Sequence, residues 1–414
     1  MSQANVVYSC SSCGYPLNLS SSNQVTSGIR SDCQKSSKKG RVNLYLPDDC
    51  LLMIFRKLQN RADRNAFGLT CHRWLQIQNI ARRSLALQFS YDPNIYRNYV
   101  IYLPRLLTRF PHLRSISLAG CTELPDSALL RLRDFGSNIR YLSLYCCFGI
   151  SEHGLAHVST GCPHLVSITL YRCNITDIGL RILAKHCKVL ENIDLSYCMQ
   201  ISDRGINALS SECSKLHCLV ISYCRAIRGT GFAGHSSTLT YLEADSCMLT
   251  PEGLSEAVSG GGLEYLNISN LRVCIGADGL AMIGAGSATK LRYLNLRMCR
   301  LVSDDSVIAI AQGCPLLEEW SLSVCHEVRN DGWSAIGSSC RNLKILHVDR
   351  CRNLCDQGLQ ALGGCVRLTV LYIHGCHRVS YTGLETFKML RQDVLIRREG
   401  CASVGPPINK FFAY

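Results

Sequence analysis

The residues of this chain with the widest range of possible chemistry are its 26 cysteines, because thiolates bind zinc, form disulfides and act as nucleophiles. Eleven of them recur at intervals of 23 to 27 residues, and we call them the cysteine ladder: Cys121, Cys147, Cys173, Cys198, Cys224, Cys247, Cys274, Cys299, Cys325, Cys351 and Cys376. Six more lie 11 positions before a ladder cysteine: Cys162, Cys187, Cys213, Cys314, Cys340 and Cys365. Even spacing over so long a stretch indicates a structural repeat rather than a reactive cluster.

One cysteine pair outside the ladder, Cys10 and Cys13, has the CxxC spacing of zinc ligands. Two thiolates at this spacing can share a zinc ion, but a structural site needs four ligands. Cys33 and Cys50 would complete such a site only at an unusual spacing. We therefore predict no metal site and no cofactor, and a zinc site at Cys10 and Cys13 stays an open alternative.

The chain contains no catalytic motif of the HExxH, P-loop or GxSxG type. Its twelve histidines are scattered, and we expect His347 and His374, on strand positions, to be surface residues rather than metal ligands. Cysteines and histidines with the spacing of a RING domain are also absent from the sequence. We therefore predict that the protein is not an enzyme and that its function is binding.

The apolar residues around each ladder cysteine predict the element that positions it. Leu165, Ile168, Leu170 and Cys173 form the pattern LxxLxLxxC, in which alternating apolar residues indicate a short strand. A second pattern, Ile201-Ser202-Asp203-Arg204-Gly205-Ile206, supplies a helix cap at Ser202 followed by helical spacing. This period and pattern are typical of leucine-rich repeats. The predicted fold is therefore α/β, a leucine-rich-repeat solenoid or horseshoe of about eleven cysteine-containing repeats over residues 113–387.

The same pattern gives the ladder cysteines a structural role. A thiol is small, largely apolar and a weak hydrogen-bond donor. At the turn that follows each strand it can fill a narrow position in the core and contact a backbone carbonyl. We prefer this interpretation to a disulfide or metal role.

The remaining segments divide the chain further. Residues 1–43 are Ser-rich and are expected to be flexible, although an organelle transit peptide has a similar composition. Residues 44–90 are expected to form a small all-α domain, since Leu51, Leu52, Ile54, Phe55 and Leu58 make an apolar helical stripe. Residues 91–112 are assigned to a linker and N-terminal cap. Residues 388–414 form a C-terminal cap and tail, with a last strand at 393–396 and a flexible end from Pro406-Pro407.

Charge and hydropathy exclude several classes of function. The net charge of +13 is concentrated in residues 1–110, which carry 15 Lys and Arg against 5 Asp and Glu. The solenoid is nearly neutral, so we predict no nucleic-acid partner. No run of 18 apolar residues occurs, and we predict no membrane association. Many cysteines without a secretory signal favour a reducing compartment, the nucleus and/or the cytoplasm.

Several short stretches resemble known families. Leu46-Pro47, Ile54-Phe55-Arg56-Lys57-Leu58 and Leu69-Thr70-Cys71-His72-Arg73-Trp74 resemble an F-box. With the cysteine-containing repeats behind it, residues 44–414 resemble the plant F-box/LRR-repeat proteins. Residues 6–19, which include Cys10 and Cys13, resemble the start of a small plant family with two CxxC pairs, of which the second pair is absent here.

The F-box resemblance implies a substrate-recognition subunit of an SCF-type (Skp–cullin–F-box) E3 ubiquitin ligase. The F-box would bind a Skp-type adaptor, and through it cullin and a RING subunit, while the repeats hold a protein destined for proteasomal degradation. A small helical domain with more apolar surface than it can bury needs a partner. The residues expected to contact the adaptor are Leu46, Pro47, Leu51, Ile54, Phe55 and Leu58. The alternative is a leucine-rich-repeat interaction scaffold without a ligase role.

We expect the substrate, a protein that the sequence does not identify, to bind the concave face of the horseshoe. Tyrosine and arginine are favoured where binding energy is concentrated. The positions just after the core residues of each strand predict the contact residues: Tyr145, Tyr171, Arg172, Tyr197, Tyr223, Asp245, Arg297, Met298, Asp349, Arg350 and His374.

Overall fold

The computed structural model describes residues 7–9, 16–18, 47–87, 102–234, 236–271, 277–400 and 403–412. The chain divides into two compact units, Met1–Ala81 and Arg82–Tyr414. The observed boundary lies before residue 90, because strand β3 (Ser84–Ala86) pairs with the sheet of the second unit. Within the segment predicted to be flexible, β1 (Val7–Ser9) pairs antiparallel with β2 (Pro16–Asn18), and Cys10 and Cys13 lie outside the described residues.

The first unit contains three helices, α2 (Asp48–Lys57), α3 (Arg61–Thr70) and α4 (His72–Ala81). Acidic residues in the first turn of α2 and basic residues in its last turn complement the helix dipole. Asn60 caps α3 by accepting a hydrogen bond from the Ala62 N–H, 2.9 Å away. The buried core of this helical module consists of Leu51, Phe55, Phe67, Ile77 and Ala81.

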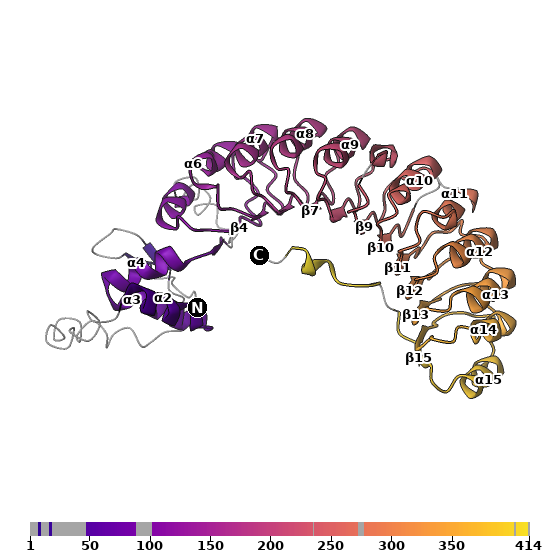
Figure 1. Cartoon of the computed structure of the whole chain (residues 1–414). Helices are drawn as coiled ribbons and strands as arrows, with labels where there is room; N and C mark the ends of the chain where they lie inside the picture. Colours follow the sequence, from indigo (N-terminus) through magenta and orange to yellow (C-terminus); the bar gives the residue numbers. More distant parts are fainter. Residues whose placement is uncertain are drawn as a thin grey trace, which may run out of the picture. The chain divides into compact units, whose positions relative to one another are not determined.

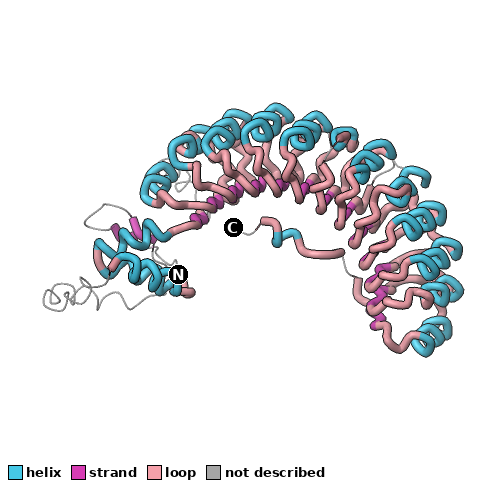
Figure 2. The backbone as a smooth tube through the Cα atoms, in the orientation of Figure 1, coloured by secondary structure: helices cyan, strands magenta, loops and turns pink. Residues whose placement is uncertain are grey.

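The second unit is a curved array with one parallel sheet on its inner side and helices on its outer side (Figures 1 and 2). Its thirteen described strands follow one another in chain order, so each repeat pairs with the next. After β3 they are β4 (Ser115–Ser117), β5 (Tyr141–Ser143), β6 (Ser167–Thr169), β7 (Asn192–Asp194), β8 (Cys218–Val220), β9 (Tyr241–Glu243), β10 (Tyr265–Asn267), β11 (Tyr293–Asn295), β12 (Glu319–Ser321), β13 (Ile345–His347), β14 (Val370–Tyr372) and β15 (Leu395–Arg397).

The outer layer is made mostly of helices of up to ten residues. They are α6 (Leu132–Phe135), α7 (Glu152–Gly161), α8 (Asp177–His186), α9 (Asp203–Glu212), α10 (Pro251–Ser259), α11 (Ala277–Ala281), α12 (Asp304–Gly313), α13 (Asn330–Ser339), α14 (Asp356–Leu362) and α15 (Tyr381–Leu390). Residues 102–109 are also helical. Short 3₁₀ turns complete the layer or lie in the tail: η3 (Asp126–Leu129), η4 (Thr230–Phe232), η5 (Met282–Gly284) and η6 (Ile408–Lys410).

The core of the array is the predicted one, and the predicted leucine-rich-repeat solenoid is confirmed. The middle residue of each central strand is buried, as at Ile168 and Ile193, which are register partners in β6 and β7. Two repeats lie beyond the eleven that were predicted, one at each end. The last of them, β15, falls where a final strand was expected, and the first, β3, is followed by no ladder cysteine.

Ladder cysteines fill core positions and donate hydrogen bonds to the preceding repeat, as predicted. The Cys173 Sγ lies 3.0 Å from the Leu144 carbonyl oxygen, and the Cys198 Sγ lies 3.0 Å from that of Leu170. The assignment of Cys274 to the cysteine ladder was wrong. In the seventh repeat Leu271 occupies the ladder position, three residues after Ile268, and Cys274 lies outside the described residues.

Each repeat is also tied to the next by a helix cap. Ser202 caps α9 as predicted, accepting from the Arg204 N–H. The carboxylate of Asp177, at the start of the previous helix, accepts from the Ser202 N–H at 2.8 Å and from the Gly205 N–H at 3.1 Å. A Cβ on Gly205 would lie 2.6 Å from that carboxylate, so the recurring glycine leaves room for the aspartate of the preceding repeat.

Candidate functional site

The predicted tyrosines form one continuous row along the inner side of the array. Backbone pairing continues beyond the assigned strands, since the Arg172 N–H donates to the Ser196 carbonyl oxygen at 2.8 Å. The rings of Tyr145 and Tyr171 stack with centroids 4.4 Å apart, and those of Tyr197 and Tyr223 stack at 4.3 Å. The Tyr171 and Tyr197 rings join the two pairs at 5.2 Å with a tilt of 59°. We call these four residues the tyrosine row.

The tyrosine row remains partly open to solvent. Tyr145 is 42% exposed and the other three are half-buried. Burial is the main cause that raises the pKa of Tyr171 and Tyr197. The guanidinium of Arg172 lies 6.0 Å from the Tyr197 ring centroid, which adds a cation–π contact to the same surface. This surface offers stacking faces and hydroxyl groups.

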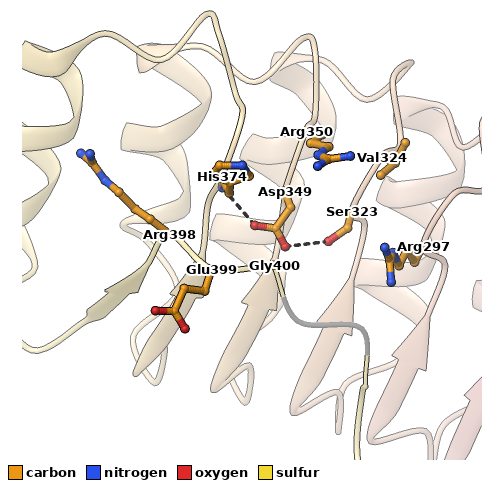
Figure 3. Close-up of a pocket in the computed structure, with 9 residues that line it drawn as sticks. All are labelled: Arg297, Ser323, Val324, Asp349, Arg350, His374, Arg398, Glu399 and Gly400. Carbon is orange, nitrogen blue, oxygen red and sulfur yellow. Dashed lines mark hydrogen bonds between the residues drawn. The ribbon is translucent and has the colours of Figure 1, made fainter.

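Further along the array, four of the predicted residues converge on one pocket. Arg297, Asp349, Arg350 and His374 line a cavity of about 370 Å³. Figure 3 shows their side chains. The rest of the lining was not predicted from the sequence: Ser323, Val324, Arg398, Glu399 and Gly400. The lining contains three arginines and one histidine against two carboxylates, so basic residue types predominate.

The carboxylate of Asp349 organises this pocket. It accepts hydrogen bonds from the Ser323 hydroxyl at 3.2 Å and from the His374 backbone N–H at 3.0 Å. Its pKa is raised, chiefly because the residue is buried. His374 is exposed, as predicted. The other predicted contact residues, Asp245 and Met298, are half-buried. Asp245 lies in the repeat after the tyrosine row, and Met298 follows Arg297 of the pocket lining in sequence.

A recurring backbone feature presents these side chains. In eleven repeats the residue just before the ladder position has a positive φ, which L-residues adopt at a cost. Arg172, Tyr197, Tyr223, Met298 and Arg350 are all at this position. The parallel backbone pairing on both sides imposes the conformation, so no short sequence motif predicts it.

A second set of inner-face residues lies within the strands, on either side of the buried middle residue. It was not predicted because the predicted contact positions come after the strand core residues. The Tyr241 and Tyr265 rings stack at 4.0 Å with an angle of 2°. Both hydroxyl groups donate to the Glu243 carboxylate, at 3.3 Å and 2.7 Å. Burial raises the pKa of Glu243 to about 7. Reading both neighbours of each central strand residue, at a period of two, would have identified this set.

The expectation for His347 was wrong. The side chain is 1% exposed, and its Nε2 lies 2.9 Å from the Glu319 carboxylate, because the flanking residues of adjacent strands pack over it. Its ring also stacks on Tyr372 with centroids 4.4 Å apart. His347 is therefore part of the packed sheet surface.

The C-terminal segment lies within the concave side of the array (Figures 1 and 2). The Gly405 N–H donates to the Glu319 carboxylate at 2.9 Å, and the Phe411 carbonyl oxygen accepts from the Ser167 hydroxyl at 3.4 Å. The Phe411 and Tyr241 rings are 4.8 Å apart. The predicted flexible end from Pro406 is thus seated on the sheet over residues 403–412, because Ile408, Phe411 and Phe412 bury apolar surface there.

In the helical module, the six residues expected to contact an adaptor have different environments. Leu51 and Phe55 are buried in the module core, and Leu58 is half-buried against it. Ile54 is 41% exposed and Pro47 is exposed, while Leu46 lies outside the described residues. Met53, which is 60% exposed beside Ile54 on α2, was missed.

The thiols of the solenoid offer little chemistry. Burial raises the pKa of Cys162 and Cys224 to about 12, so both remain protonated at neutral pH. Among the described residues, no cluster of three His, Cys, Asp or Glu side chains has the arrangement of a metal site. Within the same residues, no helix combines the length and apolar character needed to span a membrane.

Comparisons with known proteins match both parts of the chain. The Leucine Rich repeat family model matches residues 287–311, and the At4g08330 beta-tent family model matches residues 1–103. The second match extends across residues 48–81, which the structure folds into three helices. F-box/LRR-repeat protein 12 of Arabidopsis thaliana is 56% identical over 288 residues, which cover 67% of this chain and 72% of that protein.

More distant similarities are also found. A Transport inhibitor response 1-like protein of Oryza sativa subsp. japonica is 28% identical over 167 residues, and the match covers 37% of this chain but only 27% of that protein. Among solved structures, the TLR13–ssRNA13 complex matches with a TM-score of 0.54 at 14% identity, covering 78% of this chain and 52% of that one. At this identity the structural match shows the fold alone.

Proposed function

The chain belongs to the F-box/LRR-repeat proteins, and from this premise we propose that it is the substrate-recognition subunit of an SCF-type E3 ubiquitin ligase. The observation that carries the proposal is the 56% identity to an F-box/LRR-repeat protein over 72% of its length. In this role the helical module binds a Skp-type adaptor, which connects it to cullin and a RING subunit. The solenoid binds the protein to be ubiquitinated.

The helical module suits adaptor binding because it exposes apolar side chains beside a small core. Met53 and Ile54 are adjacent exposed residues on α2, while Leu51 and Phe55 on the same helix anchor it to α3 and α4. A module of this size gains stability by covering such residues with a partner. We therefore assign adaptor contact to Pro47, Met53, Ile54 and Leu58, and a supporting role to Leu51 and Phe55.

The solenoid contributes by positioning rather than by chemistry. Its inner face presents the tyrosine row with Arg172 and the basic pocket around Asp349, both rich in residue types that dominate binding energy. Holding a substrate near a charged ubiquitin carrier raises the effective concentration of the reacting groups. The protein itself needs no catalytic residue in this mechanism. We propose that it acts in the nucleus and/or the cytoplasm.

Co-precipitation of the full chain with a Skp-type adaptor tests the proposal. Met53→Asp/Ile54→Asp should abolish binding because it places two charges in an apolar interface. Met389→Asp/Leu390→Asp is a matched control on α15 of the solenoid, where these residues are 75% and 66% exposed, and it should bind like the wild type. Unchanged adaptor binding by the first variant, with its helices intact, would refute the assigned surface.

A scaffold without a ligase role is the competing interpretation, and it predicts no adaptor binding by the wild-type chain.

The substrate surface needs a separate test. Proximity labelling with the proteasome inhibited should lose proteins in a Tyr171→Ala/Tyr197→Ala/Arg350→Ala variant. Equal labelling by this variant and the wild type would show that these residues do not recognise the substrate.

A further inference from the structure

The C-terminal segment, residues 403–412, covers an apolar patch of the inner face. We call this segment the tail, and we call the surface beneath it the groove. The floor consists of Cys218, Val220, Tyr241 and Tyr265, which form a buried apolar cluster separate from the main core. Ile408, Phe411 and Phe412 of the tail, together with Tyr293, pack on this cluster. The tail therefore shows what kind of side chain the groove accepts, namely aromatic and branched aliphatic groups.

The backbone of the tail is held at both ends of this contact. At one end the Glu319 carboxylate accepts from the Gly405 N–H, and at the other Ser167 donates to the Phe411 carbonyl oxygen. Between them Pro407 has φ −67° and ψ 140°, the extended conformation that proline favours without other support. The tail thus lies as an extended peptide that turns once at η6.

Gly405 adds a steric requirement to this recognition. Its φ is +69°, and an added Cβ would lie 2.9 Å from the Tyr293 ring and 3.0 Å from the Tyr265 ring. A larger residue at this position would both strain the backbone and collide with the two rings. The groove therefore selects for glycine ahead of the two prolines.

We propose that this groove is a peptide-binding site, that residues 403–412 occupy it in cis, and that the substrate competes for it with an extended segment of the same chemistry. That segment has a glycine followed by proline, a branched aliphatic residue and then a pair of aromatic residues. Identifying the occupant as a ubiquitination substrate rests on the proposed function, whereas the groove and its cis occupant do not. A tethered segment outcompetes weak ligands because its effective concentration is high.

A second peptide can form the same two hydrogen bonds to Glu319 and Ser167 that the tail forms. They use backbone N–H and C=O groups of the occupant, and the remaining contacts are apolar side chains. The Glu319 carboxylate and the Ser167 hydroxyl belong to the sheet and stay in place when the occupant changes. Release of the tail therefore exposes a preformed site.

Fluorescence anisotropy with a labelled peptide of residues 403–414 tests the proposal on the full chain. The wild type should bind the peptide weakly, and Phe411→Ala/Phe412→Ala should bind it at least about tenfold more tightly because the cis competitor has lost its anchors. Gly405→Ala should open the groove in the same way by a different route. Met389→Ala/Leu390→Ala on α15 is the matched control and should behave like the wild type.

Peptide variants supply the specificity control. A peptide with Phe411→Ala/Phe412→Ala, or one with Gly405→Ala, should not bind the opened protein. If both opened variants keep the wild-type thermal transition and neither binds the peptide more tightly than the wild type, the tail is a permanent lining and the proposal is overturned. Adaptor co-precipitation is measured on the same proteins, so a failure of the ligase assignment is seen separately.

Discussion

Asp177→Ala should weaken the solenoid at one defined repeat interface. The carboxylate accepts three hydrogen bonds from the next repeat: from the Ser202 N–H at 2.8 Å, the Ser202 hydroxyl at 2.6 Å and the Gly205 N–H at 3.1 Å. Two of these donors are backbone groups at the start of α9. Of these, the Gly205 N–H also donates to the Ser202 carbonyl oxygen at 3.1 Å. The substitution removes the carboxylate acceptor from all three donors.

The expected cost follows from the bonds that are lost. A helix N-cap contributes roughly 0.5–2 kcal/mol and a hydrogen bond to a charged group roughly 1.5–3 kcal/mol, and neighbouring bonds are not additive. We expect the free energy of opening the α8–α9 interface to fall by about 3 kcal/mol, on the order of a hundredfold in the opening equilibrium. Because each repeat of a solenoid contacts only its neighbours, the loss should stay local.

Hydrogen exchange measured by mass spectrometry on peptides of α8 and α9 is the suitable assay, since it resolves local opening. Asp305→Ala is the matched control: Asp305 is also in the first turn of a repeat helix but is exposed. The control should change exchange little, because only a dipole interaction is lost. Equal exchange in Asp177→Ala and Asp305→Ala would show that the Asp177 hydrogen bonds do not hold the α8–α9 interface closed.

Three further predictions concern the same unit. Val324 is a β-branched residue at φ +64°, so Val324→Asn should raise the free energy of unfolding by about 1 kcal/mol in a urea titration, while Val366→Asn, at an exposed position, should not. The pKa of Glu243 is raised from 4.5 to about 7, so the folded state holds its proton more tightly and stability should fall as pH rises between these values. Glu243→Gln should remove this fall, and parallel stability–pH curves for the two proteins would contradict the assignment. Burial raises the pKa of Cys224 to about 12, so native-state alkylation at pH 8 should modify exposed Cys71 well before it, as peptide mass spectrometry can show.

Features that depend on local spacing could be predicted from the sequence. The strand residue Ile168, the cap Ser202 and the core position of Cys173 all follow from one repeat considered alone. The seventh repeat shows the limit of that approach. Cys274 has almost the right interval, but Leu271 completes the apolar pattern that begins at Leu263, and pattern rather than residue type decides the register.

Features that depend on contacts between distant residues could not be predicted. Gly405 meets Glu319 across 86 positions of sequence, and nothing near either residue indicates the other. The tyrosine row was predicted as a patch, but its stacking depends on two successive backbone positions contributing to one line of rings. Leu51 and Phe55 look equivalent to Ile54 in the sequence stripe, and only the packing of α3 and α4 separates core from surface.

We propose above that this chain joins a ubiquitin ligase through its helical module. Calorimetric titration of the purified full chain with a purified Skp-type adaptor tests it most directly, because no other component is present. We predict saturable binding with one adaptor per chain, lost in Met53→Asp/Ile54→Asp and kept in Met389→Asp/Leu390→Asp. The absence of binding by the folded wild-type protein would contradict the claim and leave the solenoid as an interaction scaffold.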